Sequence, residues 1–118
     1  MLKIARQYNL HLPLFYNDGR RIEPEKFEQV ETLVLKRYGG LTSIRQETPL
    51  RGRWHGEERI YTDLIIIISV ISTAEDFTTD ETFFTQYKEA LEGTFEQQEI
   101  FITVQDLYIL KKEGISSA

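Results

Sequence analysis

The chain has 118 residues, which suits one domain of ordinary size and is too short for two. It contains no cysteine, so disulfide bonds, thiolate zinc sites and a cysteine nucleophile are excluded. Its formal net charge of −5 argues against a nonspecific nucleic-acid binder, because such binders need many basic side chains to neutralise phosphates. We therefore expect no nucleic-acid partner.

The sequence also predicts no membrane attachment. The first residues alternate apolar and polar side chains, so they form no signal-peptide core. The longest apolar run, residues 64–68, is far shorter than the ~20 residues that a membrane helix requires. We expect a cytoplasmic protein with one α+β domain over residues 1–118, of which residues 111–118 form a loose tail.

The first predicted strand starts at Tyr8. Tyr8, Leu10 and Leu12 alternate with polar residues, which is typical of a strand with one buried face. Pro13 cannot donate to a sheet ladder, so we expect regular pairing to stop or bulge there. The sequence Asn17-Asp18-Gly19 then predicts a turn in which the glycine takes a positive φ.

The clearest helical pattern begins at Pro24, a residue that favours the first turn of a helix. Phe27, Val30 and Val34 recur at helical spacing, so they should form one buried stripe. Gly39-Gly40 follows the last periodic residues and predicts a left-handed cap at the end of the helix.

The remaining predicted elements, in chain order, are an extended edge strand over residues 41–54, a reversal over 55–59, a return strand over 60–72, a second helix with its inward stripe between 84 and 95, and a last strand over 100–110. The order is strand–helix–strand–strand–helix–strand, and its two halves resemble each other. We therefore predict an α+β, ferredoxin-like βαββαβ sandwich, in which a four-stranded antiparallel sheet carries two helices on one face.

The return strand is apolar on both of its sides. One side carries Leu64, Ile66, Ile68 and Val70, and the other carries Ile65, Ile67 and Ile71. In a two-layer sandwich the helices cover only one side of the sheet, and burying an isoleucine is worth ~1.5–3 kcal/mol. We therefore expect Ile65, Ile67 and Ile71 to form an interface. A homodimer through this open sheet face is favoured, because closed twofold dimers are the commonest oligomers. Cover by residues 41–54 of the same chain, or by a different protein, is the alternative.

The two histidines are the candidate catalytic residues. His11 lies on the side of the first strand opposite the leucines, where it would either line a cavity or make hydrogen bonds in an interface. His55 follows Trp54 beside a glycine, where the competing interpretation is a solvated turn residue. Their spacing matches no metal-binding motif, so we expect no metal and no cofactor.

Asn9, Tyr16, Arg53 and Trp54 are the candidate ligand-binding residues. Asn9, Tyr16 and Trp54 would line a cavity beside His11. The competing interpretations place Tyr16 in a polar turn and Trp54 at a sheet edge or in an interface. The sequence contains no phosphate-binding glycine loop, no nucleophile elbow and no RNA-binding aromatic motif.

Four short motifs resemble those of a group of small uncharacterised bacterial proteins, which form a domain of unknown function. The motifs are Asn17-Asp18-Gly19, Gly39-Gly40-Leu41-Thr42, Gly52-Arg53-Trp54, and Phe95-Glu96-Gln97 with Glu99-Ile100. This resemblance implies the same order of elements and no particular activity. The expected fold is more loosely similar to that of the dimeric α+β barrel enzymes, which include cofactor-free and haem-degrading monooxygenases. That similarity implies a dimer with an active site between sheet and helices.

The lack of a recognisable catalytic constellation favours a non-catalytic, self-associating protein with a binding or scaffolding role. The first alternative is a small monooxygenase or isomerase of the α+β barrel type with its pocket near His11. The second is an accessory subunit that binds another protein through the open sheet face.

Overall fold

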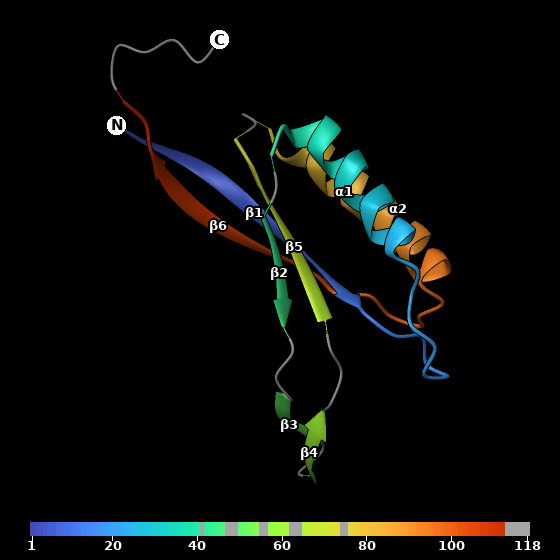
Figure 1. Ribbon diagram of the computed structural model, residues 1–118. Coiled ribbons are helices and arrows are strands. Elements are labelled where there is room, and N and C mark those ends of the chain that lie inside the picture. Colours follow the sequence, from blue (N-terminus) through green and yellow to red (C-terminus); the bar gives the residue numbers. More distant parts are fainter. Residues whose placement is uncertain (41, 47–49, 55–56, 62–64, 74–75, 113–118) are drawn as a thin grey trace.

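The computed structural model describes residues 1–40, 42–46, 50–54, 57–61, 65–73 and 76–112 (Figure 1). Its elements are β1 (Leu2–Pro13), α1 (Pro24–Tyr38), β2 (Thr42–Gln46), β3 (Leu50–Trp54), β4 (Glu57–Tyr61), β5 (Ile65–Ser72), α2 (Thr78–Thr94) and β6 (Ile102–Leu110). Four of the strands form one antiparallel sheet in the order β2-β5-β1-β6, and both helices lie on one face of it. The predicted α+β, ferredoxin-like fold is therefore confirmed.

Helix α1 begins and ends where the sequence predicts. Pro24 occupies the first turn of α1, where its missing N–H would have no helical partner. Gly39 takes a φ of 77° and donates its N–H to the Leu35 carbonyl at 2.7 Å, so it caps the helix in the left-handed conformation. Phe27, Val30 and Val34 are buried against the sheet, as the stripe predicts.

Pro13 is the last residue of β1 and lies opposite Ile65 of β5. On the other side of β1, the ladder with β6 ends at the pair Leu10 and Ile102. The His11 N–H still donates to the Phe101 carbonyl at 3.0 Å, and the backbone nitrogen of Pro13 points the same way two residues later. Because the β6 ladder ends before that position, the central strand tolerates a residue without an N–H.

The hydrophobic core lies between the helices and the sheet. Its buried members are Tyr8, Leu10, Leu12, Leu14, Tyr16, Ile22, Phe27, Val30, Val34, Ile66, Ile68, Val70, Phe84, Leu91, Phe95 and Ile100. The core includes residues from the loops at the Pro13 end of β1. These loops therefore contribute buried side chains to the core.

The opposite face of the sheet has the apolar character that the sequence predicts. Ile65 and Ile67 are half-buried and Ile71 is 47% exposed, whereas Ile66 and Ile68 point into the core. Ile44 of β2 pairs with Ile67 and adds a further exposed side chain to this face. Residues 42–46 pair along β5 as the edge strand, so this part of the predicted 41–54 segment does not cover the face. Leu64 lies outside the described residues.

The segment between β2 and β5 departs from the prediction. In place of one strand over 41–54 and one over 60–72, β3 and β4 form a separate two-stranded sheet, which projects beyond the ends of β2 and β5 (Figure 1). Trp54 pairs with Glu57 at its tip, so the reversal is shorter than the predicted 55–59. Five of the ten residues of β3 and β4 are arginine or glutamate, residue types that are mostly exposed in folded proteins.

The start of β1 also differs from the prediction. The strand begins at Leu2, six residues before the predicted Tyr8, because residues 2–6 pair with residues 106–110 of β6. These two segments, which we call the arm, extend past the helices (Figure 1). The radius of gyration is 16.5 Å, against about 13.5 Å for a compact chain of this length. Of the tail predicted over residues 111–118, only Lys111 and Lys112 lie within the described residues, and neither is in a helix or strand.

Within the described part of the chain, no helix is both long enough and apolar enough to cross a membrane.

Candidate functional site

A pocket of about 600 Å³ lies at the Pro13 end of β1. It is built from the end of β1, the loop that follows, the first residue of β5 and the loop between α2 and β6. Its lining residues are His11, Pro13, Phe15, Tyr16, Asn17, Gly19, Ile65, Gln97, Glu99, Ile100 and Phe101. The pocket therefore brings together residues that lie up to 90 positions apart in the sequence.

A tight turn holds one wall of this pocket. The Gly19 N–H donates to the Tyr16 carbonyl at 3.0 Å, and the φ of Gly19 is 91°. Asp18 accepts hydrogen bonds from the Arg20 backbone at 3.0 Å and from its Nε at 2.6 Å, and these bonds lower the pKa of Asp18. The turn predicted at Asn17-Asp18-Gly19 is therefore present, and it fixes Asn17 and Gly19 at the rim of the pocket.

Tyr16 anchors this turn to the helices. Its ring is buried, and its hydroxyl donates to Glu23 Oε2 at 2.5 Å and accepts from Lys26 Nζ. The bond from Tyr16 lowers the pKa of Glu23, and Lys26 Nζ also donates to the Thr94 carbonyl at 2.8 Å. Because the hydroxyl is already bonded on both sides, Tyr16 shapes the wall of the pocket and is poorly placed to transfer a proton.

The opposite wall is fixed by Lys88 of α2. Its ammonium donates to Glu92 Oε2 at 2.8 Å, to Glu99 Oε1 at 2.9 Å and to the Ile100 carbonyl at 2.8 Å. Glu92 Oε2 also accepts the Ile100 N–H at 2.9 Å, and the bond from Lys88 lowers the pKa of Glu92. One lysine thus holds the loop that presents Gln97, Glu99 and Phe101.

His11 contributes the titratable ring of the pocket. Its Nε2 lies 3.0 Å from the Thr103 hydroxyl, and burial lowers the pKa of His11 below its ordinary value. The imidazole is therefore neutral at pH 7, with Nδ1 left to donate or accept according to the tautomer. A neutral imidazole in a hollow can act as a general base or as a hydrogen-bond partner for a ligand.

The charge of the pocket restricts its ligands. Among the described residues that line it, none is a lysine or arginine, and Glu99 carries the one negative charge. Phosphate groups are normally bound by cations or by several free backbone N–H groups. Aromatic and aliphatic walls with a few amides and one carboxylate instead suit a neutral or cationic ring compound.

The other predicted site residues lie elsewhere. Asn9 is on the same face of β1 as His11, but it is buried and its amide oxygen accepts from Ser69 Oγ at 2.6 Å and Gln7 Nε2 at 2.8 Å. It therefore supports the sheet and does not line the pocket. Arg53 and Trp54 lie in β3, and their side chains, like the whole of His55, lie outside the described residues. Their predicted roles stay predictions.

The second half of the pocket does not follow from the sequence pattern. Gln97, Glu99 and Phe101 come from the loop between α2 and β6, and Phe15 follows Pro13. The motif Phe95-Glu96-Gln97 with Glu99-Ile100 contains two of these residues. A motif of neighbouring residues does not indicate that the loop packs beside the end of β1. Across the described residues, no group of three or more His, Asp or Glu side chains is placed to hold a metal ion.

The comparisons with known proteins show likeness in fold alone. No family model matches the chain and no curated protein matches it, so its membership of the uncharacterised bacterial group is unsupported. Among solved structures it is similar to a phage SAM lyase in complex with S-methyl-5'-thioadenosine. The TM-score is 0.59 and the identity 16%, over 95% of this chain and 93% of that chain. The apo state of a phage SAM lyase matches with a TM-score of 0.50 and 17% identity, over 98% and 94% of the two chains. The chain therefore shares the small α+β fold of these enzymes.

Proposed function

We propose that this protein is a small enzyme that binds an adenosyl thioether or adenosyl sulfonium compound in the pocket beside His11. The observation that carries the proposal is the pocket itself, which has aromatic walls, no lining cation among its described residues and a neutral imidazole. The likeness in fold to a phage SAM lyase, bound to S-methyl-5'-thioadenosine, supports that choice of ligand.

The pocket offers suitable contacts for both the adenosine and the sulfur of such a ligand. Phe101 is 65% exposed at the pocket, so its ring is free to stack on a purine, and stacking of this kind is worth ~1–3 kcal/mol per base. The amides of Asn17 and Gln97 offer donors and acceptors for the edges of the base and for ribose hydroxyls. The aromatic faces favour a positively charged sulfur, while the Glu99 carboxylate, which is already paired with Lys88, offers its remaining acceptor positions.

The proposed reaction is cleavage of one carbon–sulfur bond of S-adenosylmethionine (SAM). The sulfur keeps the electron pair of the broken bond and becomes the neutral thioether S-methyl-5'-thioadenosine. The aminobutyryl fragment completes the balance in one of two ways. Its carboxylate bonds to the carbon that loses sulfur and closes a lactone, or the neighbouring carbon loses a proton and a carbon–carbon double bond forms. His11 is the residue of this pocket that can accept such a proton.

Titration of the protein with S-methyl-5'-thioadenosine by calorimetry tests binding, and chromatography of SAM incubated with the protein tests cleavage. We expect saturable binding and accumulation of the thioether. Phe101→Ala should weaken binding by about tenfold or more, because it removes the exposed stacking ring. Tyr108→Ala is the matched control and should bind normally, because Tyr108 is an exposed aromatic residue of β6 outside the pocket. Absence of both binding and cleavage would exclude this function.

A second candidate function is non-catalytic self-association through the open sheet face. The observation that favours it is the group of partly exposed isoleucines on that face, Ile44, Ile65, Ile67 and Ile71. The partner we propose there is a second copy, and an accessory role with another protein is the alternative. Light scattering after size exclusion tests it. Ile44→Lys and Ile71→Lys should shift a dimer to the monomer, whereas a wild-type monomer would argue against this role.

A further inference from the structure

A second apolar surface, separate from the open sheet face and from the pocket, lies on the arm. Leu2 pairs with Leu110 and Ile4 pairs with Tyr108, so all four side chains share one face of the two strands. Their exposed fractions are 61%, 83%, 48% and 69%, in that order. This face continues the one that the helices cover further along β1, but the arm extends past the helices (Figure 1).

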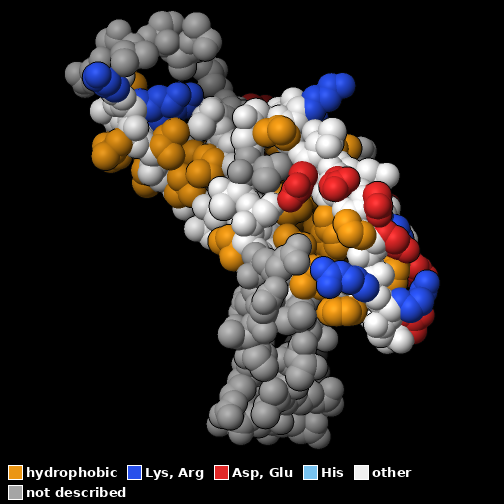
Figure 2. Space-filling model, viewed as in Figure 1, with side chains coloured by type: hydrophobic (Ala, Val, Ile, Leu, Met, Phe, Trp, Pro, Cys, Tyr) orange, Lys and Arg blue, Asp and Glu red, His pale blue; other side chains and the backbone are white. Residues whose placement is uncertain are grey.

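The end of the arm is basic. Lys3 alternates with Leu2 and Ile4 and so belongs to the other face of the strands, while Lys111 and Lys112 directly follow β6. The acid of the arm, Asp106, is already bonded to Arg6 Nε at 2.9 Å. Figure 2 shows the hydrophobic and basic side chains together at this end of the molecule and acidic side chains over the helices. Two identical arms would repel each other, so the charge disfavours a symmetric contact between arms.

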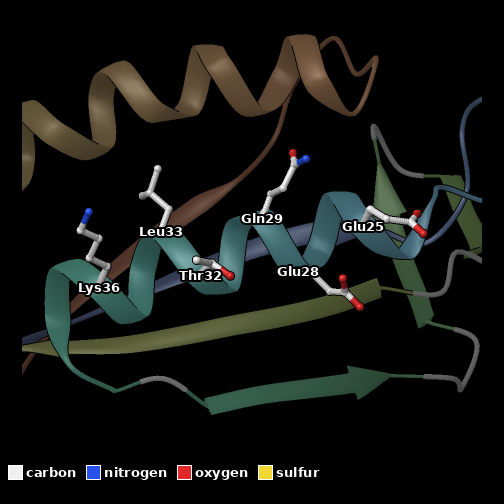
Figure 3. Close-up of a pocket in the computed structure, with 6 residues that line it drawn as sticks. All are labelled: Glu25, Glu28, Gln29, Thr32, Leu33 and Lys36. Atoms are coloured by element: carbon white, nitrogen blue, oxygen red, sulfur yellow. The ribbon is translucent and has the colours of Figure 1, made fainter.

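The outer face of α1 has the opposite charge pattern. A shallow hollow of about 530 Å³ lies there around Leu33, which is 42% exposed. Figure 3 shows that its lining residues all come from one side of α1, with Glu25 and Glu28 toward the start of the helix and Lys36 at its end. An exposed leucine beside two carboxylates complements an apolar strip at the basic end of the arm.

We propose that the arm of one copy of this chain packs on the hollow of α1 in a second copy. The contact is head to tail, so each molecule uses its arm once and its hollow once. Such contacts form a ring where the rotation between copies closes, and an open filament where it does not. A stable interface needs about 800 Å² from each partner, and the exposed part of four large side chains supplies on the order of half of that. The lysines and the backbone at the end of the arm supply the rest of the arm's share. This inference is independent of the proposed function, because neither surface belongs to the pocket.

Sedimentation of the full-length chain tests the proposal. We expect a mass that is a whole multiple of the monomer and that falls at high salt, because the contacts between the lysines of the arm and the carboxylates of the hollow are ionic. An arm variant, Leu2→Glu with Tyr108→Glu, should weaken association by about tenfold or more. It removes two apolar contacts and adds two negative charges, which the carboxylates of the hollow repel. Leu33→Lys should have a similar effect from the other side of the contact. Leu35→Lys is the matched control, because Leu35 is exposed on α1 but does not line the hollow.

Mixing the two defective variants separates this contact from any symmetric one. The Leu33→Lys copy keeps a normal arm and the arm variant keeps a normal hollow, so together they should form a one-to-one dimer that neither forms alone. A monomeric wild-type chain would overturn the proposal. So would a mixture that fails to associate, or an assembly that Leu33→Lys leaves intact. Circular dichroism of each variant checks that it is folded, and all three substituted side chains are partly or largely exposed.

Discussion

The two ends of β1 have the same alternation of apolar and polar residues but opposite surroundings. At one end Leu12 is fully buried, because helices and loops cover it. At the other end Leu2 is 61% exposed, because it has only β6 beside it. Alternation therefore tells which side of a strand is apolar, whereas the lengths and positions of other elements decide whether that side is covered.

The largest effect should come from the same substitution made at both ends. Leu12→Ala removes buried side-chain atoms and leaves a cavity, so it should lower the free energy of unfolding by ~2–5 kcal/mol. Leu2→Ala should change it by less than about 0.5 kcal/mol, because the side chain is mostly in water. Urea unfolding followed by circular dichroism measures both. The comparison is made at a protein concentration low enough to dissociate any assembly, because a second copy on the arm would cover Leu2. Equal losses under these conditions would contradict the exposure of Leu2 in the single chain.

The ionic contacts of the two ends should also differ. Lys88→Met at the pocket end removes a donor from Glu92, Glu99 and the Ile100 carbonyl, and should cost ~1–3 kcal/mol of unfolding free energy. Asp106→Asn in the arm breaks one exposed ion pair with Arg6 and should cost less than about 0.5 kcal/mol. Thermal unfolding of the two variants makes the comparison, and a larger loss for Asp106→Asn would contradict it.

A smaller effect is expected at the turn of the pocket wall. Gly19 has a φ of 91°, which a residue with a side chain rarely adopts, so Gly19→Ala should cost ~1 kcal/mol. Gly40→Ala is the control, because Gly40 has ordinary φ and an added Cβ meets nothing within 4 Å. If the two variants were equally stable, the turn would not depend on the left-handed conformation.

The smallest effect concerns pH. Burial lowers the folded-state pKa of His11, so the unfolded chain binds its proton more readily. The contribution of the neutral His11 to the free energy of unfolding is fully present above the unfolded pKa of about 6.5. It is lost as the pH falls through the lower pKa of the folded state. His11→Gln should remove this part of the pH dependence of unfolding. Asp18, Glu23 and Glu92 have lowered pKa values as well, but they lose their stabilising contributions in a separate window below about pH 4.5.

Part of the site could be predicted from the sequence and part could not. The position of His11 on the open side of β1 follows from alternation, and the turn at Gly19 follows from its residue types. Gln97 and Phe101 reach the same pocket only because β6 returns beside β1, and no local pattern reports such long-range pairing. Residues 50–54 and 57–61 could equally have continued the main sheet, and the structure places their backbone in a separate two-stranded sheet instead.

The sequence alone determined the α+β fold, the presence of two helices, the ends of α1, and the division of Ile65–Ser72 into an inward and an outward side. These features depend on periodicity and capping, which act between residues close together in the chain. The tertiary structure decided that β1 begins at Leu2, which side of the arm stays uncovered and which loops meet at His11. Those outcomes depend on strand register and on where the helices stop, and both are set by contacts between residues far apart in the chain.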